Sequence, residues 1–387
     1  MKGMKQRLLG ALVCSAILAG CAGEEATVQM APLPNVSDAV SLDRQWSTSV
    51  GSGIDQFYSQ LAPSYRYDKV FVADRDGTVK ALSPETGKVI WQVELGDDKP
   101  ARLSGGITTG FNRVIIGSEN AELVSLDQET GELQWRVTTQ GEILSNPLLD
   151  DGKVVVHTNR GVLEAFDVNS GEALWQFSGD VPNLTLRGDS SPISAGGAVF
   201  WGMASGRLGA AALENGQLLW QQPIATPRGA TEIDRLVDVD STPVIYGPRL
   251  FTVGFNGELV SIDLQSGQAA WRRPYSSAKD IAIEGQYLYL ITAEDHVVAV
   301  DVRNGLELWR NTRLEYRELS APAVIDGKVA VGDSEGYLHW LDGRSGDFVA
   351  QQSLGGDGIM VPPLAIDGDY LVTTRDGDVA RYSISSL

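Results

Sequence analysis

Residues 123–135 read LVSLDQETGELQW, and this phrase decides the fold because the chain repeats it six times with small changes. Each copy has an apolar run with a small residue inside it, a turn that contains glycine, three further residues and a tryptophan. The copies end at Trp91, Trp135, Trp175, Trp220, Trp271 and Trp309. Seven turn glycines, from Gly87 to Gly346, lie 38 to 51 residues apart. A period of this length with internal turns indicates a repeat architecture, from which the whole fold must be interpreted.

Each repeat contains three turn signals and therefore four short strands. In the seventh repeat, the turns Asp326-Gly327, Glu335-Gly336 and Ser345-Gly346 separate four apolar or β-branched runs. Glycine supplies the positive φ that tight hairpins require. Four-stranded units of this length are typical of the blades of a β-propeller, so we predict an all-β fold of antiparallel blades.

The number of blades follows from the ends of the chain. Seven repeats have the glycine turn, and an eighth runs from Pro362 to Tyr382, where it stops after three strands. The stretch 44–47 around Trp46 can supply the missing outer strand, which would close the ring and remove its free edges. We predict eight blades over residues 41–387; seven is the alternative if the N-terminal strand does not pair.

The repeated tryptophans are expected to pack between neighbouring blades, where a large apolar ring fills the widening gap. A role in stacking on a ligand is the alternative. Ala350 replaces tryptophan in the seventh repeat, so that blade junction is expected to be looser or filled by neighbouring side chains.

Residues 1–20 predict a signal peptide that is cleaved from the mature protein. A basic start precedes an apolar run over residues 8–18, which is too short to span a bilayer. The sequence Leu18-Ala19-Gly20-Cys21 resembles the bacterial lipobox, which implies cleavage before Cys21 and lipid on its thiol and amine. An ordinary secretory signal with a chance cysteine is the alternative.

Residues 21–40 are expected to form a lipidated cysteine followed by a flexible tether, because no strand periodicity occurs there. The residue after the cysteine is Ala22 and not aspartate, which in bacterial lipoproteins implies the outer membrane. Cys14 and Cys21 are the two cysteines of the chain, so the mature propeller has neither a disulfide nor thiol chemistry.

The composition excludes several classes of partner. The formal net charge is −19, and no run of five or more basic residues occurs. This charge disfavours nucleic acid and direct binding to anionic lipid head groups, so contact with a membrane is expected through the lipid anchor alone.

No catalytic or metal-binding motif emerges from the sequence. His157, His296 and His339 lie in different repeats, with no spacing that would bring ligands together. The Asp-x-x-Thr-Gly-x-x-x-Trp phrase resembles the tryptophan-docking repeats of pyrroloquinoline-quinone dehydrogenases. Those enzymes carry adjacent cysteines, calcium ligands and a catalytic aspartate, whereas this propeller has no cysteine. We expect no cofactor and no enzyme; a periplasmic quinoprotein-type enzyme and a cell-wall or glycan-binding propeller are the alternatives.

Two connecting segments are not explained by the repeat. Residues 181–192 expose leucines beside an arginine, and residues 231–243 end in closely spaced carboxylates. Both join the outer strand of one blade to the inner strand of the next, so they should be neighbours on one face of the propeller. Apolar residues on surface loops suggest a docking site. Alternatively, the leucines turn inward and the arginine pairs with one of the aspartates.

These segments carry a specific resemblance. Residues 184–188, 232–240 and 332–340, together with the lipoprotein signal and the eight blades, resemble the BamB family, the propeller lipoproteins of the outer-membrane β-barrel assembly machine. The resemblance implies a non-enzymatic scaffold that is lipid-anchored to the outer membrane and faces the periplasm. It implies binding to BamA through its POTRA domains, and help in the delivery, folding and insertion of β-barrel precursors. The contact positions it implies are Leu184, Leu186, Arg187, Asp238 and Asp240; unfolded precursors are a second candidate partner.

Overall fold

The computed structural model describes residues 28–96 and 99–386. Within these ranges the chain forms strands and no helix, and therefore no helix that could cross a membrane. The predicted signal peptide and the lipidation site at Cys21 lie outside the described residues.

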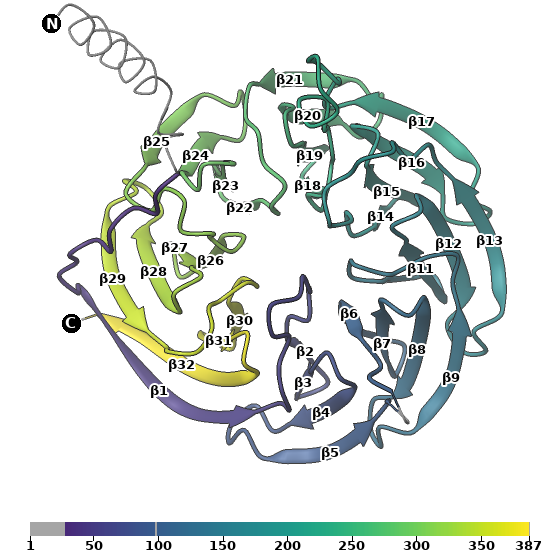
Figure 1. The fold of residues 1–387 in the computed structure, drawn as a ribbon, viewed down its shortest axis with the longest axis horizontal. Coiled ribbons are helices and arrows are strands. Elements are labelled where there is room, and N and C mark those ends of the chain that lie inside the picture. The colour runs from purple at the N-terminus through teal and green to yellow at the C-terminus, as the bar shows by residue number, and fades with distance from the viewer. Residues whose placement is uncertain (1–27, 97–98, 387) are drawn as a thin grey trace, which may run out of the picture. The chain divides into compact units, whose positions relative to one another are not determined.

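Eight four-stranded antiparallel sheets follow one another around a ring, so the predicted eight-bladed propeller is confirmed (Figure 1). From the inside outward, the first four blades are β2 (Ser64–Arg66), β3 (Lys69–Ala73), β4 (Thr78–Leu82) and β5 (Val89–Glu94); β6 (Leu103–Gly110), β7 (Arg113–Ser118), β8 (Glu122–Asp127) and β9 (Leu133–Thr138); β10 (Leu148–Asp150), β11 (Lys153–His157), β12 (Val162–Asp167) and β13 (Ala173–Ser178); and β14 (Ile193–Ala195), β15 (Ala198–Met203), β16 (Arg207–Ala212) and β17 (Leu218–Pro223).

The other four blades continue in the same order. They are β18 (Val244–Tyr246), β19 (Arg249–Val253), β20 (Leu259–Asp263) and β21 (Ala269–Arg273); β22 (Ala282–Glu284), β23 (Tyr287–Ile291), β24 (Val297–Asp301) and β25 (Glu307–Asn311); β26 (Ala323–Ile325), β27 (Lys328–Gly332), β28 (Tyr337–Asp342) and β29 (Phe348–Ser353); and β30 (Leu364–Ile366), β31 (Asp369–Thr373), β32 (Asp378–Ser386) and β1 (Val40–Ser49).

The eighth blade contains both ends of the propeller. β1 pairs antiparallel with β32 from Val40 opposite Ser386 to Ser49 opposite Asp378, and Figure 1 shows the purple strand beside the yellow one. The predicted closing stretch 44–47 lies within β1, so the alternative of seven blades is wrong.

The tryptophans do pack between blades. The ring of Trp91 lies on Gly131 of the next blade, where an added Cβ would lie 2.7 Å from the indole. The Trp91 indole N–H also donates to the backbone carbonyl of Gln128, at 3.0 Å. Gly131 is therefore required for two reasons: its φ of +76° disfavours other residues, and a Cβ at this position would collide with the Trp91 ring.

Ala350 has a structural explanation. Its neighbour, the eighth blade, has no hairpin between its two outer strands, because β32 and β1 come from opposite ends of the chain. No turn glycine exists there on which a tryptophan could dock. Ala350 is buried, and Trp340 packs edge-on against Tyr370 with ring centroids 4.8 Å apart. Neighbouring side chains therefore fill the junction between the seventh and eighth blades, which was one of the two expectations.

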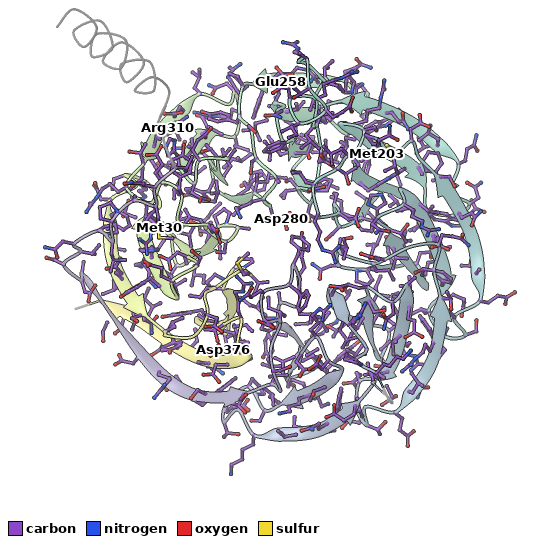
Figure 2. The ribbon with its side chains drawn as sticks, in the orientation of Figure 1. Met30, Met203, Glu258, Asp280, Arg310 and Asp376 are labelled. Atoms are coloured by element: carbon purple, nitrogen blue, oxygen red, sulfur yellow. The ribbon has the colours of Figure 1, made fainter. Side chains whose placement is uncertain are left out.

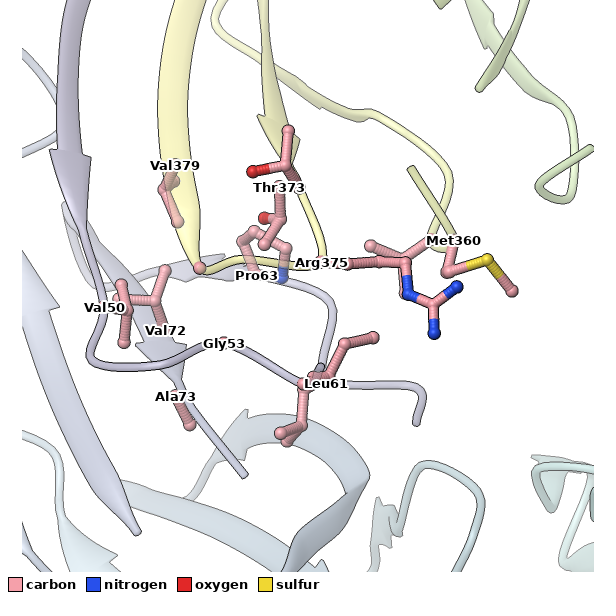
Figure 3. A pocket seen from close by; sticks show the side chains of 14 residues that line it. Val50, Gly53, Leu61, Pro63, Val72, Ala73, Met360, Thr373, Arg375 and Val379 are labelled. Atoms are coloured by element: carbon pink, nitrogen blue, oxygen red, sulfur yellow. The ribbon is translucent and has the colours of Figure 1, made fainter. Parts of the chain in front are cut away.

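The junction between the eighth and first blades is also closely packed. Figure 3 shows its lining, to which the β1–β2 loop contributes Leu61 and the segments on either side of β30 and β31 contribute Met360 and Arg375. The cavity enclosed there is about 20 Å³, enough for roughly one water molecule. This closing seam is therefore part of the core and has no room for a ligand.

Candidate docking face

The antiparallel order of the strands places every connection from one blade to the next on the same side of the ring. We call this side the crossover face. It carries the two segments that the sequence singled out, between β13 and β14 and between β17 and β18. The loop from β1 to β2 reaches the same face and extends toward the central channel (Figure 1).

Arg187 is half exposed on this face, with 50% of its side chain accessible. Its guanidinium lies 3.3 Å from Glu119 and 3.3 Å from Glu142, which come from the second blade and from the following crossover. The alternative in which Arg187 pairs with Asp238 or Asp240 is therefore wrong. The two glutamates instead fix the position of the guanidinium, and its exposed N–H groups can still donate hydrogen bonds to a partner.

Asp238 and Asp240 lie beneath the surface and not on it. Asp238 is 1% exposed, and Asp240 is also buried. Burial raises the pKa of Asp238 to about 6, although the backbone amide of Leu186 offsets part of this effect. Burial, followed by the charges of Asp238 and Asp280, raises the pKa of Asp240 to about 8. At neutral pH, Asp240 is therefore mostly uncharged, and neither side chain is placed to meet a partner directly.

The two segments nevertheless touch, as the sequence predicted. A Cβ added at Gly188 would lie 2.9 Å from a carboxylate oxygen of Asp240, so the first segment rests directly on this side chain. Asp189 of the first segment is buried in the same cluster, and burial together with the charge of Asp240 raises its pKa well above the ordinary value. The aspartates thus support the loop that presents Arg187.

The two leucines have different surroundings. Leu184 is 43% exposed, whereas Leu186 is partly buried and lines the mouth of the channel. The second segment adds Ile233, which is 71% exposed at the tip of its loop. Leu184 and Arg187 are thus both exposed on the surface, whereas Leu186 is only partly accessible, at the mouth of the channel.

Phe57 is a surface residue that the sequence analysis missed. It is 47% exposed on the β1–β2 loop, and the Arg75 guanidinium lies 3.7 Å from its ring centroid. Arg75 also pairs with Glu119 at 2.7 Å, and Glu119 in turn pairs with Arg187. A cation–π contact and two ion pairs therefore connect Phe57 to Arg187. The sequence feature that could have indicated this residue is the long loop before the first blade, which has an aromatic residue near its middle.

The channel opens on this face as a cavity of about 550 Å³. Tyr58, Arg187 and Met360 are among the residues that line it. Asp280 also lines it and lies close to the centre of the ring (Figure 2). Among residues 28–96 and 99–386, no group of three or more His, Cys, Asp or Glu could hold a metal ion. His157 is buried 3.8 Å from Asp189, and burial lowers its pKa to about 4, so it is neutral at pH 7.

Comparison with known proteins gives a consistent result. The family model described as outer membrane protein assembly factor BamB matches residues 37–99, 75–311 and 293–386. The chain is 54% identical to the outer membrane protein assembly factor BamB of Vibrio cholerae serotype O1 over 384 residues, which cover 99% of this chain and all of the relative. It is 42% identical to the protein of that name in Escherichia coli strain K12 over 391 residues, 99% of each chain.

Solved structures show the same fold. The crystal structure of BamB from Moraxella catarrhalis has a TM-score of 0.81 at 27% sequence identity and covers 89% of this chain and 100% of that chain. A quinohemoprotein alcohol dehydrogenase from Pseudomonas putida HK5 has a TM-score of 0.71 at 14% identity, covering 91% of this chain and 78% of that chain. At this identity, the likeness to the dehydrogenase extends to the fold alone.

Proposed function

Because this chain belongs to the BamB family of outer membrane protein assembly factors, we propose that it binds BamA through its crossover face. The partner is the periplasmic POTRA region of BamA. The observation that carries this proposal is the surface of Phe57, Leu184 and Arg187: Arg75 and Glu119 connect the Phe57 ring to the Arg187 guanidinium, and Leu184 is exposed on the same loop as Arg187.

The chemistry of this surface is that of a protein interface. Aromatic residues and arginine are enriched at the centres of interfaces, because they combine large apolar area with directional hydrogen bonds. Glu119 and Glu142 restrict Arg187 before binding, so less conformational entropy is lost on association. Asp238 and Asp240 act indirectly, by supporting the loop from below.

We also propose that lipid on Cys21 anchors the protein in the outer membrane with the propeller in the periplasm. The lipobox-like sequence and the family's outer-membrane role support this arrangement. From this position, the scaffold would help BamA to receive and insert β-barrel precursors, without a catalytic step. Replacement of Cys21 with serine should release the protein from the membrane fraction.

Co-purification of BamA with the tagged protein tests the proposal. Wild type should retain BamA, and Arg187→Ala and Leu184→Ala should lose most of it. Arg344→Ala is a matched control, because Arg344 is exposed on a β28–β29 hairpin at the opposite face. Loss of BamA from the control, or its full retention by both test variants at equal protein levels, would contradict the proposed surface.

A further inference from the structure

The segment before the propeller is fixed along the outside of the seventh blade. We call residues 31–39 the strap; the sequence analysis assigned them to the flexible tether. The backbone amide of Ala39 donates to the carbonyl of Val349 at 2.7 Å, and the amide of Gln351 donates to the Asp38 carboxylate at 3.1 Å. The strap thus covers the free edge of β29, the outer strand in which Ala350 replaces the repeated tryptophan.

The N-terminal end of the strap, at Ala31, is bound by a buried arginine. The Arg317 side chain is 1% exposed, and its guanidinium donates to the carbonyl of Ala31 at 2.9 Å. The backbone amide of Ala31 donates to Glu315 at 2.9 Å. Both partners lie on the crossover between β25 and β26, so the chain reaches the propeller on the crossover face.

A polar network within the seventh blade fixes Arg317. The guanidinium donates to Asp333 at 2.8 Å and pairs with Glu335. Burial lowers the pKa of His339, so the neutral imidazole donates from Nε2 to Asp333 at 2.9 Å, while Gln351 donates to Nδ1 at 3.1 Å. Burial alone would raise the pKa of Asp333, but its hydrogen bonds hold it below the usual value. The charged pair is Arg317 with Asp333, and Gln351 links it to the strap.

We propose that Arg317 clamps the strap so that the anchored N-terminus leaves the propeller on the crossover face. Without the clamp, the first residue held by the propeller would be Val40, and the N-terminal segment would then extend from the opposite face, where β1 begins beside Ser386. From Cys21 to Ala31, ten residues can span roughly 33 Å. The clamp therefore keeps the docking surface on the membrane side of the propeller. This orientation rests on the proposed lipid anchor; the clamp itself does not.

Hydrogen exchange of the full lipidated chain in detergent tests the clamp without BamA or a membrane. Ala31→Pro removes the donor to Glu315 and leaves the core intact, and Arg317→Met with Asp333→Asn removes both buried charges together. Both variants should lose protection at the amides of Ala39 and Gln351 by about tenfold or more, with β5 unchanged. Arg344→Met is the control. Unchanged protection of these amides in both variants would overturn the clamp.

Energy transfer to a lipid dye in proteoliposomes tests the orientation. A donor dye is placed at Glu294→Cys, on the crossover face, or at Arg344→Cys, on the opposite face; both positions are exposed hairpins. In wild type, transfer should be stronger from position 294, and in Ala31→Pro this difference should shrink. Equal transfer from both positions in wild type would overturn the orientation. A protein that fails to associate with liposomes would instead refute the proposed anchor.

Discussion

Arg187 and Arg317 lie on the same face of the propeller, and both pair with two carboxylates, but their surroundings differ completely. Arg187 is half exposed between Glu119 and Glu142, whereas Arg317 is buried with Asp333. An exposed pair contributes little to folding and leaves its donors available to a partner. A buried pair cannot be broken without leaving an uncompensated charge. Burial thus distinguishes a residue suited to docking from one that holds the fold.

The largest expected difference between the two arginines is in stability. Arg317→Ala should lower the free energy of unfolding by about 3–5 kcal/mol, because Asp333 remains buried without its partner. Arg187→Ala should cost less than about 1 kcal/mol. Denaturant unfolding at pH 7 measures both values. Similar losses for the two variants would show that burial does not separate their roles.

For binding to BamA, the order of the two arginines should be the opposite: changes at Arg187 should have the larger effect. Arg187→Ala combined with Leu184→Ala should weaken binding to the BamA periplasmic region by about 10- to 100-fold, since both residues are accessible on the docking surface. Arg317→Lys keeps the buried charge and should bind like wild type. Calorimetric titration measures the affinities, and a variant at Arg317 that folds but does not bind would contradict this division.

The carboxylates near the two arginines predict opposite responses to pH. Asp240 has a folded pKa of about 8, raised by burial, so the folded state retains a proton that the unfolded chain releases. Its stabilising contribution is complete below the unfolded pKa and is lost as pH rises through about 8. Asp333 has a lowered pKa, so its contribution is lost only in acid.

Unfolding measured from pH 5 to 9 tests the contribution of Asp240. Stability should fall as the pH rises from 5 to about 8 and level off above that value, with a slope of up to about 1.4 kcal/mol per pH unit for each proton that unfolding releases. Asp240→Asn should remove most of this slope between pH 6 and 8. A slope that persists unchanged in Asp240→Asn would assign it to another group.

The smallest effect is expected at the glutamates that hold Arg187. Glu142→Gln should change the free energy of unfolding by only a few tenths of a kcal/mol, because the pair is partly solvated. It should weaken BamA binding a few-fold by loosening the arginine. Glu122→Gln is a suitable control, since Glu122 pairs with Arg136 in a similarly exposed setting away from Arg187. An equal loss of binding in both variants would argue against preorganisation.

The repeat made the blades predictable, because each strand and turn is dictated by local residues. The pairing of β1 with β32 was predictable as well, since the eighth repeat lacks one strand and Trp46 precedes Trp91 by 45 residues, which is within the spacing of the repeats. The contact between the two long crossovers followed from topology alone. In each case a local pattern determines the outcome, because neighbouring blades repeat the same geometry.

The parts that the sequence did not reveal depend on contacts between loops. The loop that bears Asp238 turns its carboxylates inward, and nothing in its residue order distinguishes that from exposure. Arg187 pairs with glutamates that lie 45 and 68 residues earlier in the chain, a choice decided by loop packing. The strap resembles a linker in composition, and its docking depends on Arg317, which lies 286 residues away from Ala31.

The closed ring also constrains the order of folding. The side chain of Gln45 donates to Ser383, 338 residues away, so β1 has no partner until the end of the chain has been synthesised. Such distant pairing slows folding because a very long loop must close first. Loss of the nine residues of β32 would therefore affect both ends of the protein at once, since the first strand would lose its partner in the ring.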